Sequence, residues 1–203
     1  AEEIEEKEYI PPTPKSKTAK EQYNLAVQYY RGKGRPKNLK LAEELMLLAA
    51  NQGFTAAQNS LGILYTSFKP GRYDQALRWY REAADNGHPA AMYNLGLMYR
   101  FGKGVRRDYI ESTEWIEISA NKGFVKAMNS MGYIYRKGLG QKIDLEKAKN
   151  WYRKAALRGH STSQFNLARL HLTQYVDNPS KEIFQLAHRW LNAAALQGHR
   201  AAS

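Results

Sequence analysis

Apolar and small residues recur along most of the chain at intervals of three and four, the spacing that places side chains on one face of an α-helix. Ala91, Leu95 and Tyr99 follow this spacing in one stretch, and Ala76 and Trp79 follow it in another. No apolar run approaches the ~20 residues that a membrane-spanning helix needs. The pattern therefore predicts a chain of amphipathic helices without a transmembrane segment.

The helical stretches alternate between two patterns, and each pattern recurs five times. The first pattern is Leu-Gly-x-x-Tyr or a looser form of it, and its copies begin at Leu25, Leu61, Leu95, Met131 and Leu167. The steps between these copies are 36, 34, 36 and 36 residues. The second pattern carries Trp, or Leu45 in the first copy, and ends eight residues later in Gly53, Gly87, Gly123, Gly159 and Gly198. Repeats of this length indicate a solenoid of stacked helix pairs.

These units resemble Sel-one-like repeats, which are relatives of the tetratricopeptide repeat. The resemblance covers about residues 19–199 and rests on Leu-Gly-x-x-Tyr, on Gly-Lys-Gly-Val at 102–105 and on Trp-Tyr-Arg-Lys-Ala-Ala at 151–156. It implies an all-α fold, a right-handed α-solenoid of about five helix-turn-helix repeats, with the first helices on the concave side. It also implies a binding role, because proteins of this family are often exported bacterial adaptors, and some are periplasmic immunity proteins that neutralise a secreted toxin.

We expect five units, over residues 18–54, 55–88, 89–124, 125–160 and 161–199. Residues 1–17 are acidic and then rich in proline, which is typical of a flexible arm, and residues 200–203 look like the start of an incomplete sixth unit. In the second unit, residues 67–71 replace the glycine connector. In the fifth, we expect a longer connection from Tyr175 to Lys181.

A second stripe of residues on the first helices is the candidate binding site. When the Leu-Gly-x-x-Tyr face packs in the core, this stripe points into the hollow of the solenoid. It is rich in Tyr, Phe and Arg, which are enriched at the energetic centres of protein interfaces. Some of its aromatic residues are also expected to pack against the next unit. The stripe comprises Tyr23, Val27, Tyr30, Arg31, Tyr93, Leu97, Arg100, Phe101, Asn129, Tyr133, Arg136, Lys137, Phe165 and Arg169.

The charge of the chain favours an acidic partner. Its formal net charge is +12, and because residues 1–8 carry −4, residues 9–203 carry +16. Aromatic and basic side chains together suit an acidic protein, such as a secreted effector enzyme, better than a small-molecule substrate. Binding to nucleic acid or another polyanion is the alternative, but the tryptophans recur at a position expected to be buried, where they cannot stack on bases.

The sequence offers no catalytic constellation, metal site or cofactor site. It has no cysteine, no His-Glu-x-x-His and no Gly-x-Ser-x-Gly, and its Gly-x-Gly segments read as helix connectors. His88, His160 and His199 each follow the closing glycine of a unit. We expect them to share a structural role near a helix C-terminus, where positive charge is favourable.

The most specific hypothesis is a non-enzymatic module that binds its partner through the concave face, as an immunity protein that inhibits a secreted toxin. An adaptor scaffold for envelope assembly, signalling or host contact would have the same sequence features. The numbering begins at Ala1 instead of Met, which is expected of a chain whose leader was removed or which was trimmed. We therefore expect a periplasmic or otherwise exported protein, with the cytoplasm as the alternative.

Overall fold

The computed structural model describes residues 18–198, which form ten α-helices and, within that range, no strand. The helices are α1 (Ala19–Arg31), α2 (Leu39–Asn51), α3 (Thr55–Ser67), α4 (Tyr73–Asp85), α5 (Pro89–Phe101), α6 (Tyr109–Asn121), α7 (Val125–Lys137), α8 (Leu145–Ala156), α9 (Ser161–Asp177) and α10 (Lys181–Leu196). The predicted arm, His199 and the start of a sixth unit lie outside the described residues. The prediction of an all-α fold is confirmed.

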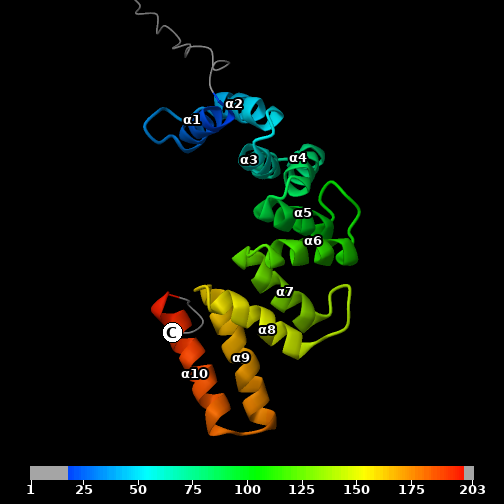
Figure 1. Ribbon diagram of the computed structural model, residues 1–203, viewed down its shortest axis with the longest axis vertical. Helices are drawn as coiled ribbons and strands as arrows, with labels where there is room; N and C mark the ends of the chain where they lie inside the picture. The colour runs from blue at the N-terminus through cyan, green and yellow to red at the C-terminus, as the bar shows by residue number, and fades with distance from the viewer. Residues whose placement is uncertain (1–17, 199–203) are drawn as a thin grey trace, which may run out of the picture.

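The helices form five pairs that follow one another along an arc (Figure 1). The main contacts join helices that are adjacent in the chain, first within a pair and then between successive pairs. Midway along the upper half of the arc, α3 lies on the inner side and α4 on the outer side (Figure 1). This is the α-solenoid that the repeats predicted, in which each unit contacts only its neighbours.

The helices begin and end where local hydrogen bonds satisfy their free backbone groups. Thr18 and Glu21 form a reciprocal capping box at the start of α1. Side-chain oxygens of Asp108 and Asp144 accept backbone N–H bonds at the starts of α6 and α8. Gly102 ends α5 with a φ of 64°, a left-handed conformation that glycine adopts without a steric penalty. The short connectors are therefore specified by the sequence itself.

The small residue in Leu-Gly-x-x-Tyr sets the distance between the two helices of a unit. A Cβ added to Gly62 would lie 2.4 Å from the Tyr80 ring, and one added to Gly132 would lie 2.6 Å from the Tyr152 ring. Glycine thus lets the first helix approach an aromatic side chain of the second helix.

The second unit closes its connection in the same way as its neighbours, although it lacks the glycine connector. The backbone N–H of Arg72 donates to the carbonyl oxygen of Tyr65 at 2.9 Å. The corresponding bond in the third unit runs from the backbone N–H of Asp108 to the carbonyl oxygen of Tyr99, at 3.0 Å. The Arg72 guanidinium lies 4.4 Å from the centre of the Phe68 ring, so a cation–π contact stabilises this different connection.

The longer connection expected in the fifth unit is wrong. Helix α9 continues through Tyr175 to Asp177, and the connection to α10 is only residues 178–180. The physical reason is that Gln174 stands where the previous unit has Gly138, so no left-handed residue ends the helix there. The added turn of α9 places the Tyr175 ring 5.7 Å from the Phe184 ring of α10.

Candidate protein-binding face

The predicted stripe lies on α1, α5, α7 and α9, and Asn59, Ile63, Thr66 and Ser67 are the corresponding residues of α3. We call the surface formed by these residues the first-helix face. Within it, Arg31, Phe101, Lys137 and Arg169 are exposed, and the remaining predicted residues are partly buried. The predicted residues therefore divide into groups that differ in how far neighbouring units cover them.

Tyr23 and Tyr93 pack against the next unit as well as lining the face. The Tyr23 hydroxyl lies 3.0 Å from the Ser60 hydroxyl oxygen, and its ring centre lies 5.3 Å from that of Phe54. Tyr93 makes the equivalent contacts 70 residues later, with Ser130 at 3.4 Å and with Phe124 at 5.4 Å. These contacts agree with the expectation that part of the stripe holds successive units together.

Asparagine replaces tyrosine at the same position in the second and fourth units. The Asn94 amide donates to Asn59 Oδ1 at 3.0 Å, which links α3 to α5. The Ser163 hydroxyl donates to Asn129 Oδ1 at 2.9 Å, which links α7 to α9. The predicted residue Asn129 is therefore occupied by a contact between units, and the stripe alternates between aromatic and amide links.

All four predicted residues of the first unit line one hollow between α1 and α3. Its volume is about 200 Å³. The lining residues are Tyr23, Val27, Tyr30, Arg31, Met46, Ser60 and Ile63. Apolar and aromatic side chains thus surround a space beside an exposed guanidinium. Met46, Ser60 and Ile63 were missed because the prediction treated each first helix separately, whereas the hollow forms only where two units meet.

A second hollow of about 210 Å³ lies between α3 and α5. Leu97 and Phe101 are the predicted residues that line it, together with Asn94, Thr66 and Lys103. Phe101 is 58% exposed, which is unusual for so large an apolar side chain at a wet surface. The face therefore offers two neighbouring hollows, and each has a cationic side chain in its lining.

Arg100 and Arg136 lie against the same aromatic ring. Their guanidinium carbons are 4.7 Å and 5.4 Å from the centre of the Tyr133 ring. The Nε of Arg136 and the hydroxyl of Tyr152 are buried, and neither has a hydrogen-bond partner among residues 18–198. Burial raises the pKa of the Tyr152 hydroxyl, and the nearby positive charge of Arg136 partly offsets that rise. The two side chains are nevertheless not placed to form a hydrogen bond with each other. This cluster joins the third and fourth units.

The fifth unit continues the face with one aromatic and one basic residue. Phe165 is partly buried, Arg169 is exposed, and the Arg169 guanidinium lies 5.8 Å from the centre of the Phe165 ring. The helices α1, α5, α7 and α9, which carry the predicted residues, are therefore first helices of one solenoid.

The positive charges of the first-helix face have no acidic partner within the part of the chain that the structure describes. The ion pairs there are Arg72–Glu43, Lys147–Asp144 and Lys149–Glu146, none of which includes a residue of the face. An acidic partner would meet these cations without first displacing a carboxylate of residues 18–198.

His88 and His160 lie at helix N-termini, so the expectation of a role near a helix C-terminus is wrong. Each is the N-cap of the next helix, where Nδ1 accepts a backbone N–H, from Ala91 at 3.2 Å and from Ser163 at 3.2 Å. Burial lowers the pKa of both imidazoles, and Lys126 lowers that of His160 further. A neutral ring is required because a charged one could not accept the bond.

Residues 18–198 hold no group of three or more His, Asp or Glu side chains arranged to bind one metal ion. None of their helices combines the length and hydrophobicity that crossing a membrane requires.

These features define a tetratricopeptide-like α-solenoid in which side-chain contacts link the first helices of successive units. The Sel1 repeat model matches residues 22–54, 55–88, 89–124, 125–160 and 161–199. The chain belongs to the Sel1 repeat family, which confirms the resemblance seen in the sequence. Members of this family are generally non-catalytic scaffolds that bind proteins.

The chain spans only part of the length of several similar proteins. DAP3-binding cell death enhancer 1 of Rattus norvegicus is 34% identical over 73 residues, which are 36% of this chain and 14% of that protein. A protective antigen of uropathogenic Escherichia coli with an SLR fold has a TM-score of 0.82 and 33% identity, covering 91% of this chain and 39% of that chain. A Sel1 repeat protein from Oxalobacter formigenes has a TM-score of 0.79 and 28% identity, and the match covers 95% of this chain and 76% of that chain.

An immunity protein from Pseudomonas aeruginosa also shares the fold. Its TM-score is 0.55 at 21% identity, and the match covers 96% of this chain and 70% of that chain. This likeness concerns the fold alone.

Proposed function

We propose that this chain is a non-enzymatic module that binds an acidic protein on its first-helix face, and that this partner is a secreted bacterial toxin neutralised in the periplasm. The observation that carries the proposal is the hollow between α1 and α3. There, Tyr30 and Ile63 lie beside exposed Arg31 around a space of about 200 Å³. Tight interfaces are typically centred on such hollows, where one partner inserts an apolar anchor and pairs its charges nearby.

The chemistry of the face supports an acidic partner with apolar side chains. Exposed cations such as Arg31 and Lys137 steer an acidic protein towards the face and pair with it after contact. The exposed ring of Phe101 and the hollow beside it would lose water when an apolar side chain docks. The inhibitor role is motivated by the Pseudomonas aeruginosa immunity protein of the same fold.

Two alternatives remain distinct from this proposal. An adaptor scaffold would use the same face for a protein that is not a toxin. A nucleic-acid binder would need exposed aromatic platforms, but Trp79 and Trp151 are only 8% and 9% exposed and pack in the core. The structure therefore favours a protein partner over a polyanion.

The test combines affinity capture with reconstitution. The tagged chain is used to capture partners from the source organism, and one captured protein is purified and titrated with the chain. The face variant carries Arg31→Glu, Phe101→Ala and Lys137→Glu, which are exposed positions on the first-helix face. The control carries Lys122→Glu, Arg153→Glu and Leu157→Ala, which are exposed on or beside the second helices and give the same change in charge.

We expect the face variant to weaken the reconstituted complex by about tenfold or more and the control to leave it unchanged. Inhibition of a toxic activity of the partner, lost in the face variant, supports the immunity role. A stoichiometric complex without any inhibited activity supports the scaffold instead. If the two variants bind equally well, or if nuclease removes all captured material, the first-helix face is not the binding site.

A further inference from the structure

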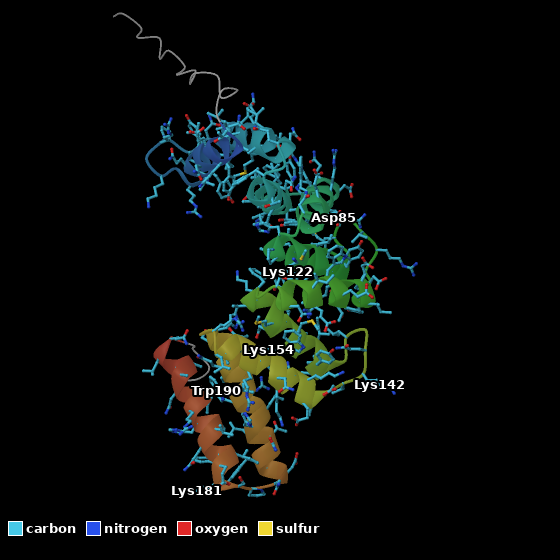
Figure 2. The ribbon with its side chains drawn as sticks, in the orientation of Figure 1. Asp85, Lys122, Lys142, Lys154, Lys181 and Trp190 are labelled. Atoms are coloured by element: carbon cyan, nitrogen blue, oxygen red, sulfur yellow. The ribbon has the colours of Figure 1, made fainter. Side chains whose placement is uncertain are left out.

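The connections after α5 and α7 form a second surface, separate from the first-helix face. Both connections project from the outer side of the arc (Figure 1), and Lys142 lies at the outer edge of the second one (Figure 2). We call the surface formed by residues 104–110 and 138–145 the loop edge.

The backbone of the loop edge is held in place by its own packing. Gly140 has a φ of 71°, and a Cβ added to it would lie 2.9 Å from the carbonyl oxygen of Tyr109. The connection of the fourth unit therefore rests directly on the start of α6 in the third unit. The Asp108–Tyr99 and Asp144–Tyr135 backbone bonds, both 3.0 Å, close the two connections. A surface that is ordered before binding loses little conformational entropy when it binds.

A hollow of about 610 Å³ lies along the loop edge. The lining residues are Tyr99, Val105, Arg106, Arg107, Asp108, Tyr109, Ile110 and Gly140. No residue lines both this hollow and either hollow of the first-helix face. A molecule bound here would therefore not occupy the space used by a partner on that face.

Three large aliphatic side chains of the loop edge are exposed. Ile110 is 63% exposed, Ile143 is 64% exposed and Leu145 is 44% exposed. They come from two successive units that Gly140 brings together. Single exposed apolar residues are ordinary, but Ile110 also lines the hollow, and an exposed apolar side chain beside a hollow is typical of an interaction surface.

Basic side chains outnumber acidic ones on the loop edge. Arg106, Arg107 and Lys142 are exposed, and none forms an ion pair with a residue in the described range 18–198. Asp108 accepts two backbone N–H bonds of α6, and Asp144 accepts one of α8 and pairs with Lys147. Both carboxylates keep their charge, but Arg106 and Arg107 outnumber Asp108 among the residues that line the hollow, so the lining has a net positive charge.

We propose that the loop edge is a docking surface for an acidic protein segment that carries a large apolar side chain. The apolar side chain enters the hollow beside Ile110, and the flanking carboxylates pair with Arg106, Arg107 and Lys142. Charge complementarity selects an acidic segment, and the hollow selects a protein side chain over a flat bilayer surface. The chain can then hold two acidic proteins, or two parts of one, at the same time.

The probe is a short synthetic peptide of aspartate, glutamate and glycine with one central phenylalanine, and its partner probe has serine in place of phenylalanine. Binding is followed by the backbone amide NMR signals of Gly104 and Gly140, one from each connection, in about 0.15 M salt, where exposed charges are partly screened. The loop-edge variants are Arg106→Glu with Arg107→Glu, and Ile110→Ser with Ile143→Ser. The control is Lys122→Glu with Arg153→Glu.

We expect the phenylalanine peptide to shift both glycine signals saturably and to bind about tenfold more tightly than the serine peptide. Either loop-edge variant should remove this preference, whereas the control and the first-helix face variant should keep it. The proposal is overturned if the glycine signals do not move or if both peptides act alike. It is also overturned if only vesicles of phosphatidylcholine and phosphatidylglycerol move the signals, since the surface would then be membrane-binding. None of these results bears on the first-helix face, because binding there is followed by the backbone amide signals of its own residues.

Discussion

The guanidinium carbon of Arg100 in α5 lies 4.7 Å from the centre of the Tyr133 ring in α7, so a cation–π contact joins the third unit to the fourth on the first-helix face. Both residues are partly buried. Because such a contact strengthens as water is removed, the pair contributes to the stacking of the two units as well as to the chemistry of the face.

We predict that Arg100→Met and Tyr133→Leu are coupled in a double-mutant cycle. The coupling free energy should be about 0.5–1 kcal/mol, the usual range for a cation–π contact that is not fully buried. Urea unfolding of the four proteins, followed by circular dichroism, measures it. Arg100→Met combined with Phe184→Leu, on the distant helix α10, should be additive. If both cycles are additive, the Arg100–Tyr133 contact does not stabilise the fold.

Much of the fold could be predicted from single residues because the same position recurs in every unit. Leu95 and Tyr99 predicted a buried helix face, and both are buried. Gly96 lies between them, and a Cβ there would lie 2.6 Å from Ile116. The prediction of the buried face needed only helical periodicity.

Features that depend on two elements at once were not predictable in this way. Met46 of α2 and Ile63 of α3 line the hollow beside Arg31, and neither belongs to the helix on which the stripe was traced. His88 lies between two helices, so its position after a glycine fits an end or a start equally well. Pro89, at the first position of α5, was the signal that could have identified His88 as an N-cap.

Gly104→Ala should destabilise the protein more than Gly53→Ala. Both glycines have a positive φ, of 67° and 81°, so alanine at either position costs about 1–2 kcal/mol in backbone strain. A Cβ at Gly53 would meet open space, whereas one at Gly104 would lie 2.8 Å from the backbone of Tyr73. We expect a further cost of about 1–3 kcal/mol for Gly104→Ala. Thermal unfolding of both variants tests this, and equal losses would mean that the connection does not rest tightly on α4.

Stability should fall as the pH is lowered below about 6.5, the ordinary pKa of histidine. Burial lowers the folded-state pKa of His88, His160 and His171, with Lys149 and Arg153 lowering that of His171 further. The unfolded state therefore binds protons first as the pH falls, and stability present above pH 6.5 is lost down to the folded-state pKa values.

The measurement is the free energy of unfolding by urea between pH 7.5 and pH 5. His88→Asn with His160→Asn should give a shallower pH dependence, because asparagine is a good N-cap that does not titrate. At pH 7.5 this variant should be about as stable as the original chain, which serves as the control for its folding. An unchanged slope would mean that the two N-caps do not carry the pH dependence.

Arg72→Ala should weaken the second unit chiefly by removing contact with an aromatic ring. The Arg72 guanidinium lies 4.4 Å from the centre of the Phe68 ring and donates to Glu43 at 3.2 Å. Because the Arg72 side chain is 48% exposed, its ion pair with Glu43 is screened by water and contributes little. We expect Arg72→Ala to cost about 0.5–1 kcal/mol and Glu43→Gln to cost less.

Urea unfolding at low and high salt separates the two contacts, because the ion pair is the more sensitive to salt. If Glu43→Gln costs as much as Arg72→Ala and high salt removes both effects, the ion pair holds this connection instead of the ring.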